Sequence, residues 1–256
     1  MSSAEPLLAF AQAWFAIAGL VFLRVGAAMA LLPGFGEQSL PLRVRLAAAL
    51  AFTAVVAPAV APGLPQLGGA ALLQAVAAEV VIGLALGFGA RLLLVALHFG
   101  GAMVAQATSL AQMAGASAPD PQPAIGQALT IAGLALAMAA RLHVRIAALF
   151  ILSYELLPAG RMPAAADLSR WSLSETSAAL TLGFTIAAPF LIAALLFNTA
   201  MGVLNRAMPQ LMVVFVGAPL LTFGALAMLV AVAPPALALW LRALTRFLAD
   251  PFSVVP

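Results

Sequence analysis

The chain has 256 residues, of which 65% are hydrophobic and only 7% are charged, and its mean hydropathy is +1.14. Soluble domains carry about a quarter charged residues, so this composition predicts an integral membrane protein and excludes a sizeable soluble domain. The net charge of +3 comes from few charges rather than a basic patch, and no cysteine is present. We therefore expect no nucleic-acid partner, no disulfide and no cysteine-ligated metal.

Six apolar blocks follow one another along the chain and predict an all-α polytopic membrane protein. Each block can supply the ~20 residues that cross a bilayer as a helix. They cover residues 8–32, 46–62, 70–100, 124–158, 177–204 and 210–241. We expect them to form a single membrane-embedded domain, residues 1–256.

The first and third blocks contain opposite charges, Arg24 and Glu79. A lone charge at mid-membrane costs ~2.5–3.5 kcal/mol, so each residue needs a partner or water. A buried structural ion pair between them is the favoured interpretation, and a coupling-ion or proton site is the alternative. In the same third block, Gly83 and Gly87 lie on one helix face and predict close packing against another helix.

Residues 105–123, AQATSLAQMAGASAPDPQP, are small, polar and rich in turn formers. They predict a long irregular loop between two blocks, and such loops are usually functional or disordered.

In the fourth block, Arg141 and Arg145 share one helix face. They face a wet cavity, acids of a partner subunit or the headgroups, or they lie where two shorter elements meet.

The connector before the fifth block reads as an exposed loop that ends with Trp171 at the membrane interface. The capping-box pattern from Ser172 to Glu175 then predicts the start of the fifth helix. The uncharged run 176–205 would be ~45 Å long as a helix, against a hydrocarbon core of ~30 Å. We expect breaks or kinks to absorb the excess at the prolines of the last two blocks, Pro189, Pro219, Pro234 and Pro235.

The segment between the last two blocks carries a polar cluster, Asn205, Arg206, Pro209 and Gln210. A plain membrane span does not need such a cluster. Further on, residues 239–250 place Arg242 and Arg246 four apart among apolar side chains. This pattern predicts either an amphipathic interfacial helix or an ordinary helix end with snorkelling arginines.

Nothing in the sequence indicates an enzyme. The two histidines, His98 and His143, are far apart and have no carboxylate at ligand spacing. The motifs of zinc peptidases, serine hydrolases and P-loop enzymes are all missing. We expect no catalytic residue, no cofactor and no metal site.

Several motifs together resemble the FliR family of bacterial flagellar export-gate proteins. The clearest is Gly202-x-x-Asn205-Arg206-x-x-Pro209-Gln210-Leu211-x-Val213-x-x-Val216-Gly217-x-Pro219-Leu220. The others are Arg24 with Pro33, Pro41-x-Arg43-x-Arg45, Glu79-x-x-Ile82-Gly83-x-x-x-Gly87-Phe88 and Ser153-x-x-x-Leu157-Pro158-x-Gly160. The resemblance covers nearly the whole chain, although each motif is short.

The resemblance implies a non-enzymatic subunit of the flagellar type III protein export gate in the bacterial inner membrane, at the flagellar basal body. Its partners would be FliP-like and FliQ-like membrane subunits, an FlhB-like switch protein and unfolded export substrates. Its fold would be kinked helical hairpins that pack with homologous subunits around an export channel.

In this family a loop plugs the closed channel, and by position it matches residues 105–123 here. The Gly-Leu-Ser of many members is replaced by Ala107-Thr108-Ser109-Leu110. A reversible seal favours soft apolar groups on a mobile segment. The candidate plug residues are Gln106, Leu110, Gln112, Met113 and Gly115. An ordinary surface loop is the alternative.

The polar cluster from Asn205 to Gln210 is expected to cap a broken helix and contact neighbouring subunits, and contact with passing substrate is the alternative. Two other functions stay open. A related virulence-type injectisome would use the same kind of subunit. A small secondary transporter would use Arg24 and Glu79 as its site.

Overall fold

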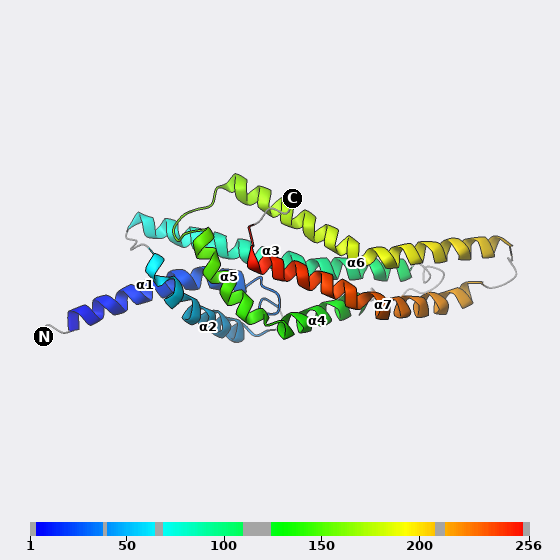
Figure 1. Ribbon diagram of the computed structural model, residues 1–256, viewed down its shortest axis with the longest axis horizontal. Helices are drawn as coiled ribbons and strands as arrows, with labels where there is room; N and C mark the ends of the chain where they lie inside the picture. The colour runs from blue at the N-terminus through cyan, green and yellow to red at the C-terminus, as the bar shows by residue number, and fades with distance from the viewer. Residues whose placement is uncertain (1–3, 38–39, 65–68, 110–123, 208–212, 253–256) are drawn as a thin grey trace. The chain divides into compact units, whose positions relative to one another are not determined.

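The computed structural model describes residues 4–37, 40–64, 69–109, 124–207 and 213–252. Every regular element in these residues is helical, which confirms the predicted all-α class (Figure 1). The elements are α1 (Ala4–Met29), α2 (Leu42–Val60), the short 3-10 helix η1 (Ala61–Gly63), α3 (Ala70–Ser109), α4 (Ala124–Ala139), α5 (Leu142–Leu156), α6 (Ala165–Ala207) and α7 (Val213–Ala249).

Four of these helices are long and apolar enough to cross a membrane, namely α2, α3, α6 and α7. The count is five if α4 and α5 together form one span. The prediction of a polytopic membrane protein is therefore confirmed.

The fourth apolar block is divided at Arg141, whose φ of 60° places it in the left-handed region. Arg141 and Arg145 thus lie where two shorter helices meet, and both are exposed.

Helix α3 continues to Ser109, so the first five residues of the predicted irregular loop, 105–109, are helical. The prediction of an irregular backbone is wrong for them, because alanine and glutamine are strong helix formers that extend the preceding span. The rest of that loop, 110–123, lies outside the described residues.

Helix α6 begins at Ala165, seven residues before the predicted capping box at Ser172. The prediction of an exposed loop is therefore wrong for residues 165–171, whereas residues 158–164 before them are not helical, as predicted. Alanines favour helix, and Asp167 in the first turn complements the helix dipole. Trp171 is only 6% exposed, and its Nε1–H donates to the carbonyl of Pro251 at 2.8 Å.

The prolines of the last two blocks do not end their helices. Helix α6 runs through Pro189, and α7 runs through Pro219, Pro234 and Pro235. Helices tolerate proline in a membrane because breaking the helix there would leave further backbone groups without partners. Residues 239–249 form the last turns of α7, so they are no separate helix, and their position at a membrane surface stays a prediction.

The described chain divides into two compact units. The first contains residues 1–92, 138–176 and 244–256, and so includes α1, α2, the first half of α3, and α5. Within it α1 and α2 lie side by side (Figure 1). Its core is built from fully buried apolar side chains on α1, α3 and α5: Val21, Val25, Ile82, Leu86, Ile146 and Phe150. Phe52 of α2 packs edge-on against Phe150 at 6.1 Å.

The second unit contains residues 93–137 and 177–243. The second half of α3 contacts α4, α6 and α7 there. A Cβ on Gly101 would overlap the backbone of Gly126 in α4, so these two helices touch through their main chains. Trp240 of α7 is fully buried, and its Nε1–H donates to the carbonyl of Leu93 at 2.7 Å.

Candidate functional site

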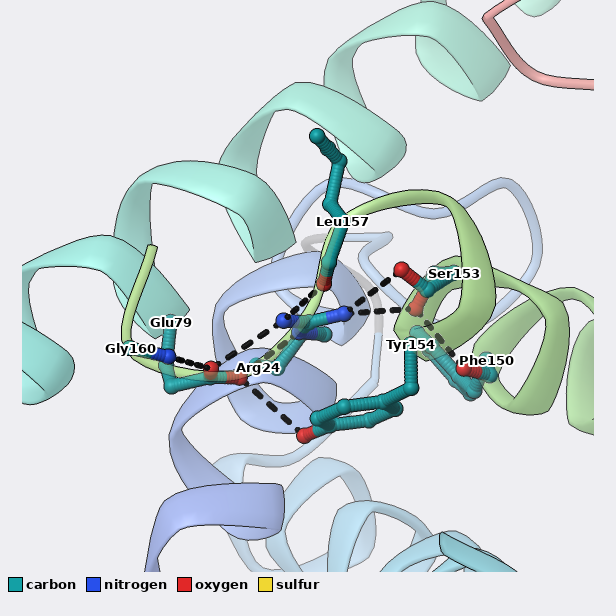
Figure 2. A network of polar contacts seen from close by, with 7 residues as sticks. All are labelled: Arg24, Glu79, Phe150, Ser153, Tyr154, Leu157 and Gly160. Atoms are coloured by element: carbon teal, nitrogen blue, oxygen red, sulfur yellow. Dashed lines mark hydrogen bonds and ion pairs between the residues drawn. The ribbon is translucent and has the colours of Figure 1, made fainter. Parts of the chain in front are cut away.

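The two charges predicted to pair from the sequence lie together in the first unit, between α1 and α3 (Figure 2). The Nε–H of Arg24 donates to Oε2 of Glu79 at 2.6 Å, and Nη2 donates to Oε1 at 3.1 Å. This is a bidentate pair, and neither side chain has any exposed area. Such a geometry adds specificity to charge attraction because the planar guanidinium fits only one orientation of the carboxylate.

The remaining guanidinium donors of Arg24 bind the end of α5 (Figure 2). Nη1 donates to the carbonyl and to Oγ of Ser153, at 2.9 and 3.0 Å. Nη2 also donates to the carbonyl of Leu157 at 3.0 Å, just beyond the last residue of α5. The ring of Tyr154 lies 3.7 Å from the guanidinium carbon, a cation–π contact. Every N–H direction of the arginine therefore has a partner.

Both carboxylate oxygens of Glu79 likewise have further hydrogen-bond donors. The hydroxyl of Tyr154 donates to its Oε2 at 3.1 Å. The backbone N–H of Gly160 donates to its Oε1 at 3.4 Å, and Gly160 has a φ of 77° that favours glycine. The network joins α1, α3, α5 and the turn after α5. Because a saturated pair without exposed area has no position for an ion or solute, this arrangement fits a structural role better than a transport site.

The two glycines predicted to permit close packing lie in α3 beside α1. A Cβ on Gly83 would overlap the carbonyl oxygen of Arg24. A Cβ on Gly87 would come within 2.6 Å of the carbonyl oxygen of Ala28, one turn further along α1. The backbones of the two helices are therefore in contact on this face, which brings Glu79 close enough to meet Arg24.

One candidate plug residue lies in the described part of the chain. Gln106 is exposed near the end of α3, and it lines a pocket of about 590 Å³ in the second unit. The other lining residues come from α3 and α6, and all are apolar except Asn198. The remaining candidates, Leu110, Gln112, Met113 and Gly115, lie outside the described residues.

Only part of the polar cluster after the fifth block lies within the described residues. Asn205 and Arg206 form the last turn of α6, and both are exposed. Pro209 and Gln210 lie outside the described residues. Arg206 near the C-terminal end of α6 complements the helix dipole.

Sequence reasoning missed two members of the charge network, Ser153 and Tyr154. Ser153 was part of a motif without an assigned role, and Tyr154 is the single tyrosine of the chain. A rare polar side chain in an apolar block is the signal that could have pointed to them. Among the described residues, no group of three histidine, aspartate or glutamate side chains is arranged to hold a metal ion.

Comparison with known proteins agrees with these motifs. The sequence model of the family described as "Bacterial export proteins, family 1" matches residues 15–247. The flagellar biosynthetic protein FliR of Caulobacter vibrioides is 36% identical over 210 residues, which cover 80% of this chain and 83% of that relative. The flagellar biosynthetic protein FliR of Escherichia coli K12 is 29% identical over 220 residues, which cover 83% of this chain and 84% of that relative. The chain therefore belongs to family 1 of the bacterial export proteins, the family of the FliR proteins.

Proposed function

We propose that this chain is a subunit of the flagellar type III protein export gate and forms part of the conduit for unfolded flagellar proteins. Membership of the export family and two relatives named flagellar biosynthetic proteins support a role in flagellar biosynthesis and export. We further propose that it resides in the bacterial inner membrane at the flagellar basal body. Its partners there would be FliP-like and FliQ-like subunits and an FlhB-like switch protein.

The strongest structural support is the excess of exposed apolar surface on α6 and α7. The apolar run of α6, residues 176–205, is about 45 Å long, whereas the hydrocarbon core is about 30 Å thick. Large apolar side chains are exposed over most of this run, from Leu180 to Leu204. In the most apolar stretch of α7 only 11% of the residues are buried, against 61% in α3.

Lipid alone would leave part of this surface in water. A 45 Å helix at the steepest usual tilt, about 40°, still exceeds the hydrocarbon core. Exposed apolar patches of this extent mark protein–protein interfaces. Packing against homologous helical subunits would cover the surface. An isolated carrier would have no such subunits to cover it.

We propose that the segment 105–123 helps to close the conduit. Gln106 on the last turns of α3 lines an apolar pocket, so the start of this segment already borders a recess of the second unit. Met113 and Leu110 supply deformable apolar groups for a reversible seal. Deletion of residues 108–118 should raise the ion leak of cells that express the export proteins. Unchanged leak together with unchanged export would contradict the plug.

The two alternatives are less well supported. Both relatives are named for the flagellum, which favours it over an injectisome. A small transporter would need a charged site that its solute or ion can reach, whereas Arg24 and Glu79 are fully buried and mutually saturated.

The proposal is tested by complementation and co-purification. In a strain that lacks its own FliR, the chain should restore secretion of flagellar subunits and should co-purify with FliP-like and FliQ-like proteins. Uptake of a small solute by liposomes that contain only this chain, without co-purification of partners, would contradict the proposal.

A further inference from the structure

A groove of about 310 Å³ lies between α1 and α2 in the first unit. Small and apolar side chains line most of it. Phe22, Gly26 and Ala30 come from one face of α1, and Leu42, Leu46 and Ala49 come from one face of α2. The volume lies at the lower end of the range of small-molecule sites, about 300–1,000 Å³.

A positive charge lies at one end of this groove. Arg45 shares the lining face of α2, and its Nε–H donates to the carbonyl of Leu40 at 3.2 Å, which holds the side chain near the start of the helix. Arg43 is two residues earlier and exposed. No carboxylate of the described residues lies within 4.0 Å of either guanidinium. The nearest acid along the chain, Glu37, is paired with Arg91 at 2.6 Å.

The length of α2 places these arginines at the level of lipid headgroups. Its 19 residues span about 28 Å, close to the hydrocarbon thickness of about 30 Å. The outer side of the helix is apolar and exposed, as at Leu50 and Val55. When α2 spans the bilayer, its N-terminal turn therefore reaches the interface, where arginine binds lipid phosphate.

We propose that the groove between α1 and α2 binds one acyl chain of an anionic phospholipid, whose phosphate is held by Arg45. The occupant must be apolar along most of its length and negative at one end, which matches a phospholipid. Free phosphate would use only the arginine end. An apolar helix of a partner would leave the Arg45 guanidinium without a counter-ion. The site is independent of the export role.

The arginine end is tested on the full chain, purified in detergent, by native mass spectrometry with added phosphatidylglycerol or phosphatidylcholine. The wild type should retain phosphatidylglycerol preferentially. Arg45→Gln should weaken its retention about fivefold. Arg45→Lys should retain most of the binding. Arg161→Gln, at another exposed arginine, is the matched control and should change nothing.

The apolar end is tested by filling the groove. A Cβ on Gly26 would meet only the ring of Phe22, at 3.7 Å, so Gly26→Leu fits the helix and occupies the groove. This variant should lose retention of both lipids, whereas Leu50→Phe on the outer side of α2 should keep it. Thermal unfolding of each variant distinguishes loss of the site from loss of the fold.

Three results would overturn the proposal. Displacement of phosphatidylglycerol by millimolar inorganic phosphate would reduce the site to a simple anion site. Equal retention by wild type, Gly26→Leu and Arg45→Gln would place the lipid elsewhere. Photo-crosslinking from Ala30 to a partner subunit in the purified complex, with no lipid adduct, would assign the groove to a protein helix.

Discussion

The substitution Glu79→Gln should destabilise the chain by about 3–5 kcal/mol, because the Arg24 guanidinium would stay buried without a counter-ion. Both side chains lack any exposed area, and the pair distance is 2.6 Å. For a chain of this length the loss corresponds to a decrease in the unfolding midpoint of roughly 6–20 °C. Thermal unfolding of the purified chain in one detergent, followed by tryptophan fluorescence, measures it.

The matched control is Glu37→Gln. It removes the Arg91–Glu37 pair, which has the same 2.6 Å distance but side chains that are 37% and 28% exposed. Exposed pairs contribute about 0–1 kcal/mol, so the midpoint should fall by less than about 4 °C. The double variant Arg24→Met with Glu79→Met should lose less than the sum of its single variants, because it leaves no unpaired buried charge. Equal effects of Glu79→Gln and Glu37→Gln would refute the claim that burial sets the strength of these pairs.

Three further substitutions test the packing by the same measurement. Gly83→Ala should lower the free energy of unfolding by about 1–3 kcal/mol, because the new Cβ overlaps a carbonyl of α1. Gly19→Ala, where no atom lies within 4 Å of the new Cβ, is the control. Equal unfolding midpoints of the two variants would contradict the close contact between α1 and α3. Arg141→Gly should stabilise by about 1 kcal/mol, because the left-handed backbone favours glycine; a lower midpoint would show that the arginine side chain compensates for its strain. Trp240→Phe should cost about 1–3 kcal/mol, because the carbonyl of Leu93 loses its buried donor; an unchanged midpoint would mean that this hydrogen bond is dispensable.

The all-α membrane class could be predicted because a chain with so few charged and so many apolar residues requires a lipid environment. The pairing of Arg24 with Glu79 could be anticipated for a related reason. A charge inside an apolar block demands compensation, and few opposite charges are available in this chain. Gly83 and Gly87 likewise indicated a helix contact, although the sequence could not name α1 as the partner.

Helix ends and distant partners could not be predicted. Local capping and turn residues argued for a start at Ser172, but helix propensity and the burial of Trp171 extended α6 to Ala165. Tyr154 reaches Glu79 across 75 residues of sequence, and no local pattern encodes such a contact. The long α6 also continued through Pro189, because the membrane favours an intact helix over a break.

The central claim is that the apolar faces of α6 and α7 are covered by partner subunits. A photo-crosslinking residue placed at Leu196, which is 67% exposed, or at Val230, which is 78% exposed, tests it in cells that assemble flagella. We expect adducts with FliP-like or FliQ-like subunits at both positions. Adducts with lipid alone, on a chain that purifies as a monomer, would contradict the claim.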